Sequence, residues 1–160
     1  MQVTLFSVGK LKKNRTLELF EEYNKRLHGN LKLIGVHNYC IKEIPQSKES
    51  TAALRSEQEG KKLLSLVDNT TRLILLDERG ENLTSREFAS YLKKSIDDGV
   101  SNIIFSIGGT DGFCPQVRSR ADKLISFGKL TWAHQLARIM LVEQLYRATT
   151  IILNHPYHRD

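Results

Sequence analysis

Residues 103–113 read IIFSIGGTDGF, and this stretch decides the fold class. The run from Ile103 to Ile107 does not alternate between apolar and polar residues, and Ile and Phe favour extended backbone, so it predicts a fully buried strand. Gly108 and Gly109 lack a Cβ, so the backbone can adopt positive φ or approach another group closely. Ligands of open α/β folds bind beyond the carboxyl ends of strands, so we expect one here. A strand followed by a tight turn explains the stretch equally well, because a lone glycine pair is not specific.

Strands and helices alternate on either side of this stretch. Apolar runs predict strands at 3–8, 31–36, 72–76 and 124–127, and helical spacing predicts helices at 15–27, 54–67, 84–98, 115–121 and 134–153. Gly29 is expected to end the first helix, and Thr84 with Glu87 has the capping-box pattern. The polar segment 42–56 is predicted to be a loop leading into the second helix, with Glu59 on an exposed face. The alternation predicts an α/β fold with a largely parallel sheet, in a single domain over residues 1–160.

Composition places the chain among ordinary globular proteins. Its 160 residues are 40% hydrophobic and 26% charged, enough to build one sizeable core. No window approaches the length of a membrane span and the start lacks a secretory h-region, so we expect a cytoplasmic protein. The two cysteines, Cys40 and Cys114, are far apart and no paired-His spacing accompanies them, so neither a disulfide framework nor a metal site is expected. Cys114 is predicted to be a packing residue.

The chain is basic, which favours a polyanionic partner. The net charge is +6 and the pI is near 9.4, although many basic domains bind nothing anionic. Lys10, Lys12, Lys13 and Arg15 follow the first strand and Gly9. A basic loop at such a place could contact phosphates, and it could equally be a solvated loop.

Three strand ends could enclose a nucleoside-like ligand. The ends are Leu76-Asp77, the glycine pair and the segment 127–132, with Leu76, Leu130 and Trp132 as apolar walls. Asp111 could orient a polar group of the ligand or take up a proton, and it could also simply cap the turn.

The C-terminal third carries further candidate residues. His134 and Arg138 stand one helical turn apart and would project from the same face, although a histidine at a helix start is often only a cap. The helix 134–153 is so apolar that it is either central to the domain or packed against another copy of the chain. The tail from Asn154 to Arg159 offers Tyr and His to stack on an unpaired base and Arg to pair a phosphate, although chain termini are often frayed.

Several motifs stand in a fixed order along the chain: Ser7–Lys10, Glu59-Gly60, Leu76-Asp77, Ile107–Gly109 with Gly112, Thr131–His134, Leu145–Ala148 and Asn154–His158. In this order and spacing they resemble the RlmH-type methyltransferases of the SPOUT class, from end to end of the chain. The resemblance implies an α/β domain whose parallel sheet is flanked by helices, with a C-terminal trefoil knot at roughly 103–153. It also implies an obligate homodimer that binds S-adenosylmethionine in a bent conformation and methylates N3 of a pseudouridine in 23S rRNA of the assembled ribosome. Because true knots are nearly absent among folds, residue patterns alone would not have predicted one.

The resemblance also assigns residues. Cofactor-binding positions of the family match Leu76, Gly108, Phe127, Gly128, Lys129, Leu130, Thr131 and Trp132. Positions associated with substrate or catalysis match His134, Arg138, Arg147, Tyr157 and His158, with His155 beside them. The family commonly has proline before the histidine, whereas this chain has Ala133, which removes a φ restraint from the cofactor loop.

The implied reaction needs orientation and a base. A sulfonium methyl is already activated, so the protein must place it in line with the ring nitrogen, whose proton must be removed or whose anion must be stabilised. Candidate bases are Asp111, His134 and His158, and Arg138 or Arg147 could stabilise the anion. We expect one subunit's tail to complete the other's cofactor pocket. Two alternatives remain: a catalytically silent RNA- or ribosome-binding protein, and a small-molecule α/β enzyme that uses another nucleotide.

Overall fold

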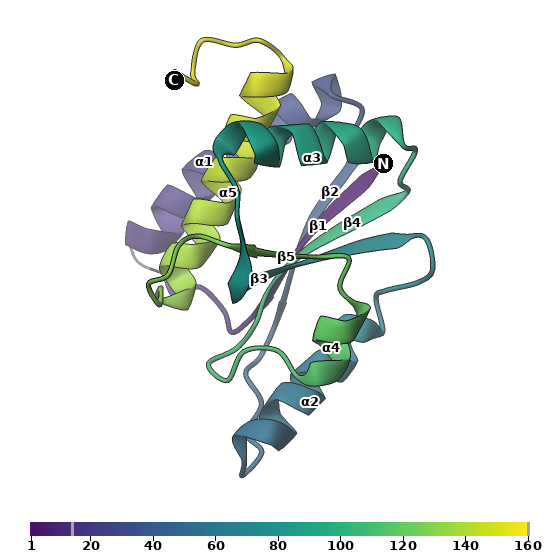
Figure 1. Cartoon of the computed structure of the whole chain (residues 1–160). Coiled ribbons are helices and arrows are strands. Elements are labelled where there is room, and N and C mark those ends of the chain that lie inside the picture. The colour runs from purple at the N-terminus through teal and green to yellow at the C-terminus, as the bar shows by residue number, and fades with distance from the viewer. Residues whose placement is uncertain (14, 160) are drawn as a thin grey trace.

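The computed structural model describes residues 1–13 and 15–159, which form one parallel five-stranded sheet and five helices (Figure 1). The sheet order is β2-β1-β4-β3-β5, and every pair of neighbours is parallel. The strands are β1 (Gln2–Val8), β2 (Asn38–Ile44), β3 (Thr71–Asn82), β4 (Asn102–Ile107) and β5 (Lys123–Ser126). The helices are α1 (Arg15–Leu33), α2 (Ala52–Leu64), α3 (Ser85–Asp97), α4 (Pro115–Arg120) and α5 (His134–Ile152).

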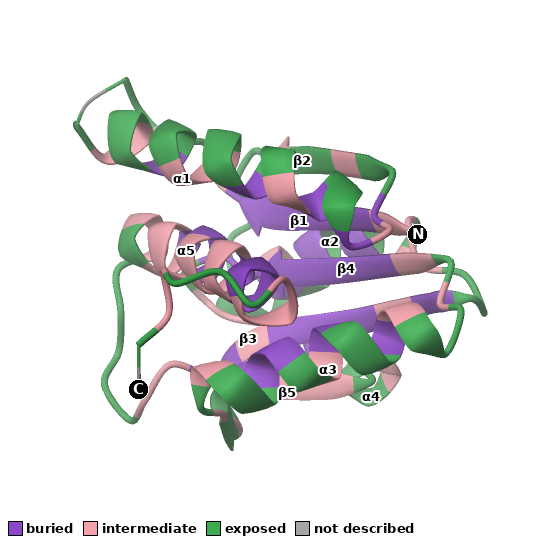
Figure 2. Cartoon of the chain, turned by 90° about the horizontal axis from the view of Figure 1, so that it is seen from above, coloured by how far each residue is buried: buried purple, intermediate pink, exposed green. Residues whose placement is uncertain are grey.

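Helices cover both faces of the sheet. On one face α5 packs against α1 and α3, and on the other α2 packs against α4 (Figure 1). Ile103 and Phe105 of the central strand join the core on the α5 side, whereas Ile104 joins the core on the α2 side. β4 is therefore buried along almost its whole length (Figure 2), and a strand buried on both faces has no reason to alternate apolar and polar residues.

Most of the predicted elements are confirmed. The strands near residues 3–8, 103–107 and 124–127 form, as do the helices that begin at Pro115 and His134. The capping box is present: Thr84 Oγ1 accepts from the Glu87 amide at 3.2 Å, and Glu87 Oε2 accepts from the Thr84 amide at 2.7 Å. Among the described residues, no helix is long and apolar enough to cross a membrane.

The predicted strand at 31–36 is wrong, because α1 continues through Gly29 to Leu33. Leu27 and Leu31 lie on the buried face of this helix, and burying them outweighs the cost of about 1 kcal/mol for an exposed helical glycine. The helix ends at Gly35 instead, whose φ is +88°. There the Val36 amide bonds to Leu31 O at 2.9 Å and the Gly35 amide to Lys32 O at 3.3 Å, which is a Schellman motif.

The predicted loop at 42–56 is too long. Residues 42–44 belong to β2 and residues 52–56 to α2, which leaves residues 45–51 as the connection. β2 is an edge strand with most of its residues exposed, so its sequence carries no apolar run that would mark it as a strand.

β3 runs past its predicted end and shapes the region that follows. It pairs with β5 as far as Leu76, leaves the ladder, and pairs again at Glu81 and Asn82. At Gly80 the backbones come so close that a Cβ would lie 2.5 Å from the Ile125 nitrogen, so only glycine fits. The bulge from Asp77 to Gly80 stands beside the carboxyl ends of β4 and β5, where it forms one wall of a cavity.

Candidate active site

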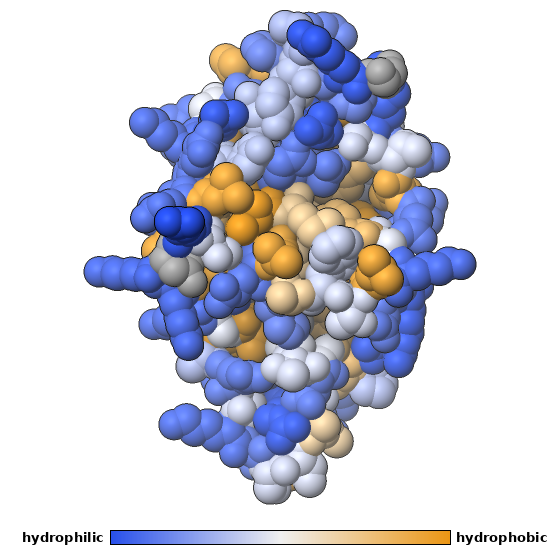
Figure 3. Space-filling model, turned by 90° about the vertical axis from the view of Figure 1, so that its left-hand side faces the viewer, coloured by the Kyte–Doolittle hydropathy of each residue, from blue (hydrophilic) through white to orange (hydrophobic). Residues whose placement is uncertain are grey.

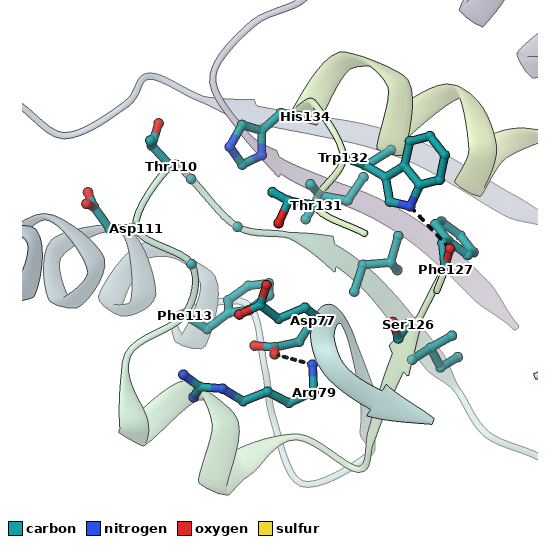
Figure 4. Close-up of a pocket in the computed structure, with 18 of the residues that line it drawn as sticks. Asp77, Arg79, Thr110, Asp111, Phe113, Ser126, Phe127, Thr131, Trp132 and His134 are labelled. Carbon is teal, nitrogen blue, oxygen red and sulfur yellow. Dashed lines mark hydrogen bonds between the residues drawn. The ribbon is translucent and has the colours of Figure 1, made fainter. Parts of the chain in front are cut away.

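A cavity of about 330 Å³ lies beyond the carboxyl ends of β4 and β5 and beside the bulge of β3 (Figure 4). Its volume is in the range of sites that bind small molecules. Three segments line most of it: 76–79 after the regular part of β3, 107–113 after β4, and 125–132 from β5 to the start of α5. This is the edge of the sheet where the sequence predicted a ligand.

The glycine loop, residues 108–112, closes on itself beside the cavity. The Gly112 amide donates to Gly109 O at 3.0 Å, and Gly112 has a φ of +69°. A Cβ on Gly109 would lie 2.5 Å from Glu59 Oε2 and 3.1 Å from Val8 Cγ1. The second glycine is thus required by close packing against α2 and β1.

Side chains from the β2–α2 region hold the glycine loop from behind. Arg55 makes a two-pronged ion pair with Asp111, from Nε to Oδ2 at 2.7 Å and from Nη2 to Oδ1 at 3.1 Å. Gln46 Nε2 donates to Thr110 Oγ1 at 2.5 Å. Glu59, which was predicted to be exposed, is instead buried, and its Oε1 accepts from the Ser47 amide at 2.8 Å.

The ion pair changes what Asp111 can do. The hydrogen bond from Arg55, with the charge of its guanidinium, lowers the pKa of Asp111 below its ordinary value. A carboxylate that is already paired and hard to protonate is a poor proton acceptor. The geometry therefore favours Asp111 as a residue that fixes the loop over Asp111 as a base.

The segment from Phe127 to Trp132 forms a compact loop on the opposite side. Trp132 Nε1 donates to Phe127 O at 3.2 Å, as Figure 4 shows, and Ser126 Oγ donates to Gly128 O at 2.7 Å. Leu130 and Trp132 remain 70% and 39% exposed, so two apolar side chains stand at the cavity with much of their surface open to a ligand. All of the predicted cofactor positions line this cavity except Lys129.

A charged pair on the third wall was missed from the sequence. Arg118 Nε donates to Asp77 Oδ2 at 2.8 Å. The Arg79 amide donates to Asp77 Oδ1 at 3.0 Å, as the dashed line in Figure 4 shows. Asp77 is only 9% exposed. The position of Asp77 after a predicted strand was a usable signal, but nothing in the sequence brought Arg118 to it from a helix 41 residues away.

His134 and Arg138 have different surroundings although they are one turn apart. His134 is the first residue of α5, lines the cavity and does not cap the helix, since Ala133 occupies the cap position. Arg138 is buried outside the cavity, where it contacts Glu43 at 2.6 Å and donates to the carbonyl oxygens of Val8 at 2.8 Å and Gly9 at 2.6 Å. Burial lowers the pKa of Arg138, and the charge of Glu43 opposes that shift.

The tail folds back on the last turns of α5. Glu143 Oε1 accepts from Arg147 at 2.5 and 3.0 Å and from the Tyr157 hydroxyl at 3.1 Å. The Arg147 guanidinium lies 4.9 Å from the Tyr157 ring centre and 3.4 Å from His158 Nδ1. Burial raises the pKa of the Tyr157 phenol. His155 is exposed and its Nδ1 accepts from the Tyr157 amide at 3.2 Å.

The tail and the cavity lie at opposite ends of α5. The helix has 19 residues, and at about 1.5 Å per residue it is roughly 28 Å long. The structure thus groups the predicted site residues into two separate sets, one around the cavity with His134 and one around Arg147, and Arg138 belongs to neither.

The cysteines and other potential metal ligands form no site in the described part of the chain. No group of three or more His, Cys, Asp or Glu side chains there could hold a metal ion. Cys114 is 2% exposed and packs where α4 meets α2: a Cβ on Gly60 would lie 2.8 Å from its sulfur. Its predicted role as a packing residue is confirmed.

Comparisons with known proteins agree with this geometry. The family described as "Predicted SPOUT methyltransferase" matches residues 1–158, and the chain belongs to this family. Relatives with the name ribosomal RNA large subunit methyltransferase H are similar over their full length. Those of Bartonella henselae and Bartonella tribocorum are 46% and 45% identical over 159 residues, with 99% of each chain covered. That of Brucella anthropi is 45% identical over 160 residues, covering both chains completely. The resemblance seen in the motifs is thereby confirmed.

Solved structures support the fold alone. The "probable methylase family protein" of Haemophilus influenzae matches with a TM-score of 0.51 at 12% identity, covering 99% of this chain and 70% of that one. The "probable methyltransferase" of Bordetella pertussis matches with the same score and identity, covering 92% and 95%. Both matches accord with the predicted α/β class and its parallel sheet flanked by helices.

Proposed function

We propose that this chain transfers a methyl group from S-adenosylmethionine to N3 of a pseudouridine in 23S rRNA, with the assembled cytoplasmic ribosome as substrate. The observation that carries the proposal is the cavity at the strand ends, which gathers nearly all of the expected cofactor positions from three separate segments. The full-length relatives named as ribosomal RNA methyltransferases support the substrate. A silent RNA-binding protein would not need such a cavity, and an enzyme acting on a small molecule would leave the basic surface without a role.

The residues present fit the cofactor. Leu76, Leu130 and Trp132 offer apolar surface to the adenine ring, and the loop 127–132 offers backbone amides and carbonyls to its polar edge. The charged side chains of Asp77 and Arg118 line the same cavity and suit the amino-acid end. When bound, the cofactor supplies a sulfonium whose methyl group is electrophilic. The protein then has to orient the acceptor and exclude water.

His134 is the base that the geometry favours. It lines the cavity of its own chain, whereas Asp111 is held by Arg55, and Nδ1 of His158 is already in contact with Arg147. We assign to His134 the acceptance of the N3 proton, so that the ring nitrogen attacks as an anion. Arg147, Tyr157 and His158 would hold the target ring and its phosphate.

A second copy of the chain would bring the cavity residues of one chain together with the tail residues of the other. Leu19 of α1 and Leu136 of α5 are 41% and 48% exposed, and Ile139 and Met140 are half-buried. The side of the molecule that carries α1 and α5 shows a cluster of apolar residues with hydrophilic ones around it (Figure 3). Such a patch is typical of an interface. We propose a homodimer in which one subunit's tail completes the other's cavity.

The trefoil knot is also part of the proposal. After its bulge β3 pairs again with β5 and continues into α3, whereas β5 leads into α5, which packs against α1 and α3. We propose that residues 127–133 pass through the arm formed by residues 77–84, which would make a knot within residues 103–153 of a single domain. A crystal structure in which residues 127–133 pass outside the arm would contradict it.

The first test is cofactor binding. Trp132→Ala removes an exposed apolar wall and should raise the Kd for S-adenosylmethionine about tenfold, which corresponds to the loss of roughly 1.4 kcal/mol of contact. Lys129→Ala is the matched control, because Lys129 is in the same loop but does not line the cavity. Calorimetric titration of the three proteins measures the effect. If the folded parent chain shows no binding, the proposed function fails.

A further inference from the structure

Three lysines stand close together on the connection from β1 to α1. Lys10, Lys12 and Lys13 are exposed, and none forms an ion pair with a described residue; we call residues 10–13 the lysine loop. Lys93 of α3 and Lys123 of β5, by contrast, are each paired with a carboxylate: Lys93 contacts Asp97 and Lys123 contacts Glu81, each at 2.5 Å. The lysine loop is thus a concentration of uncompensated positive charge.

The loop starts at the rim of the cavity. Val8, two residues before Lys10, packs against Gly109 of the cavity wall. Ala137, another lining residue, is followed by Arg138, which bonds to the carbonyl oxygen of Gly9. The loop leaves the sheet at the same end as the connection from β5 to α5 (Figure 1). The lysine loop therefore begins close to one wall of the cavity.

Buried contacts fix the base of the loop. The Gly9 amide donates to Ile44 O at 2.7 Å, and Gly9 takes a φ of +84°. Glu43 Oε1 accepts both from the Leu11 amide at 3.2 Å and from Arg138 Nη1 at 2.6 Å. Leu11 itself packs on the core. A loop held in this way loses less conformational entropy when it binds than a free one would.

We propose that the lysine loop binds backbone phosphates of the RNA strand that carries the target nucleotide. Arg138 and Glu43 are positioning residues that hold the loop at the cavity rim. Phosphate contacts orient a nucleic acid without reading its sequence, which suits an enzyme whose other site residues hold the target base. This inference rests on the proposed function, because it takes RNA as the substrate.

The test replaces the three charges together. The variant K10Q/K12Q/K13Q is compared with K61Q/K62Q/K94Q, which removes the same charge from exposed lysines in the last turns of α2 and α3. Ribosomes that lack the methyl group serve as substrate, and kcat, KM for ribosomes and the Kd for S-adenosylmethionine are measured at several salt concentrations.

We expect the loop variant to raise KM for ribosomes at least tenfold, with kcat and the cofactor Kd within twofold of the parent. The slope of log KM against log salt should fall by about 2 to 3, because each lost phosphate contact removes 0.7 to 0.9 of a unit. The control variant should lose less than half as much of that slope as the loop variant loses.

Three results would overturn the inference or its basis. If the loop variant and the control behave alike while the parent methylates ribosomes, the lysine loop does not bind RNA and the proposed function stands. If the loop variant sediments at half the mass of the parent, the loop belongs to an interface between copies. If the parent itself does not methylate ribosomes, the proposed function fails before the inference is reached.

Discussion

Arg55 and Asp111 are 56 positions apart in the sequence, yet their contact determines the chemistry open to the glycine loop. Asp111 could be picked out from the sequence as a candidate acid or base, because it follows a glycine pair. Its partner could not, since Arg55 is an ordinary charged residue on an amphipathic helix. Glu59 was misplaced on the exposed face for the same reason: only the fold shows that its carboxylate packs against Gly109 and bonds to the Ser47 amide.

The effect of the ion pair on Asp111 can be measured. Arg55→Gln should raise the pKa of Asp111 towards its ordinary value near 4, followed by the NMR shift of its carboxyl carbon. Asp68 is an internal control, because its pKa is lowered by hydrogen bonds from Thr70 and Thr71. A carboxyl group whose pKa is lowered by folding stabilises the folded chain at pH values above its ordinary pKa. The advantage of the parent over Arg55→Gln in Tm should therefore shrink as the pH falls below about 4. An unchanged pKa at Asp111 would rule out the pairing.

Helices and strands could be predicted from the sequence where the buried apolar residues recur with a simple spacing. The central strand and α5 could be read from apolar residues alone, and the capping box marked the start of α3. The edge strand β2 could not, because its side chains are mostly exposed and hydrogen bonding to β1 defines it. The end of α1 was misassigned because Gly29 was the predicted stop, whereas of the two glycines only Gly35, which lies in the predicted strand 31–36, has positive φ.

These two glycines give opposite predictions for the same substitution. Gly29 is helical, and a methyl group added to its Cα would have no neighbour within 4 Å, so Gly29→Ala should stabilise the fold by about 1 kcal/mol. Gly35→Ala should destabilise it by about 1 kcal/mol or more, because a φ of +88° strains any residue with a Cβ. Urea denaturation of both variants measures the difference. Stabilisation by Gly35→Ala would contradict the assigned end of α1.

For the whole molecule, the separation of the cavity from the tail is the feature that no sequence pattern gave. The spacing of the motifs assigned both the cavity residues and the tail residues to one functional site. The distance between them is set by the length and direction of α5. Mixed dimers test whether two chains share a site. Dimers of Arg147→Ala with Trp132→Ala contain one site free of both changes, so at S-adenosylmethionine concentrations well below the Kd of Trp132→Ala they should be well above either homodimer in a ribosome methylation assay. No recovery would count against a shared site.

In the proposed dimer, the roughly 28 Å length of α5 separates the cavity of a chain from its own tail, and this separation has a kinetic consequence. A lone chain would have the cofactor cavity but not the partner's tail that completes the site, so it would not methylate RNA. Turnover per chain would then depend on how many chains are present, rising with concentration and levelling off once nearly all are associated. A cell making too few copies would lose methylation more steeply than it loses protein.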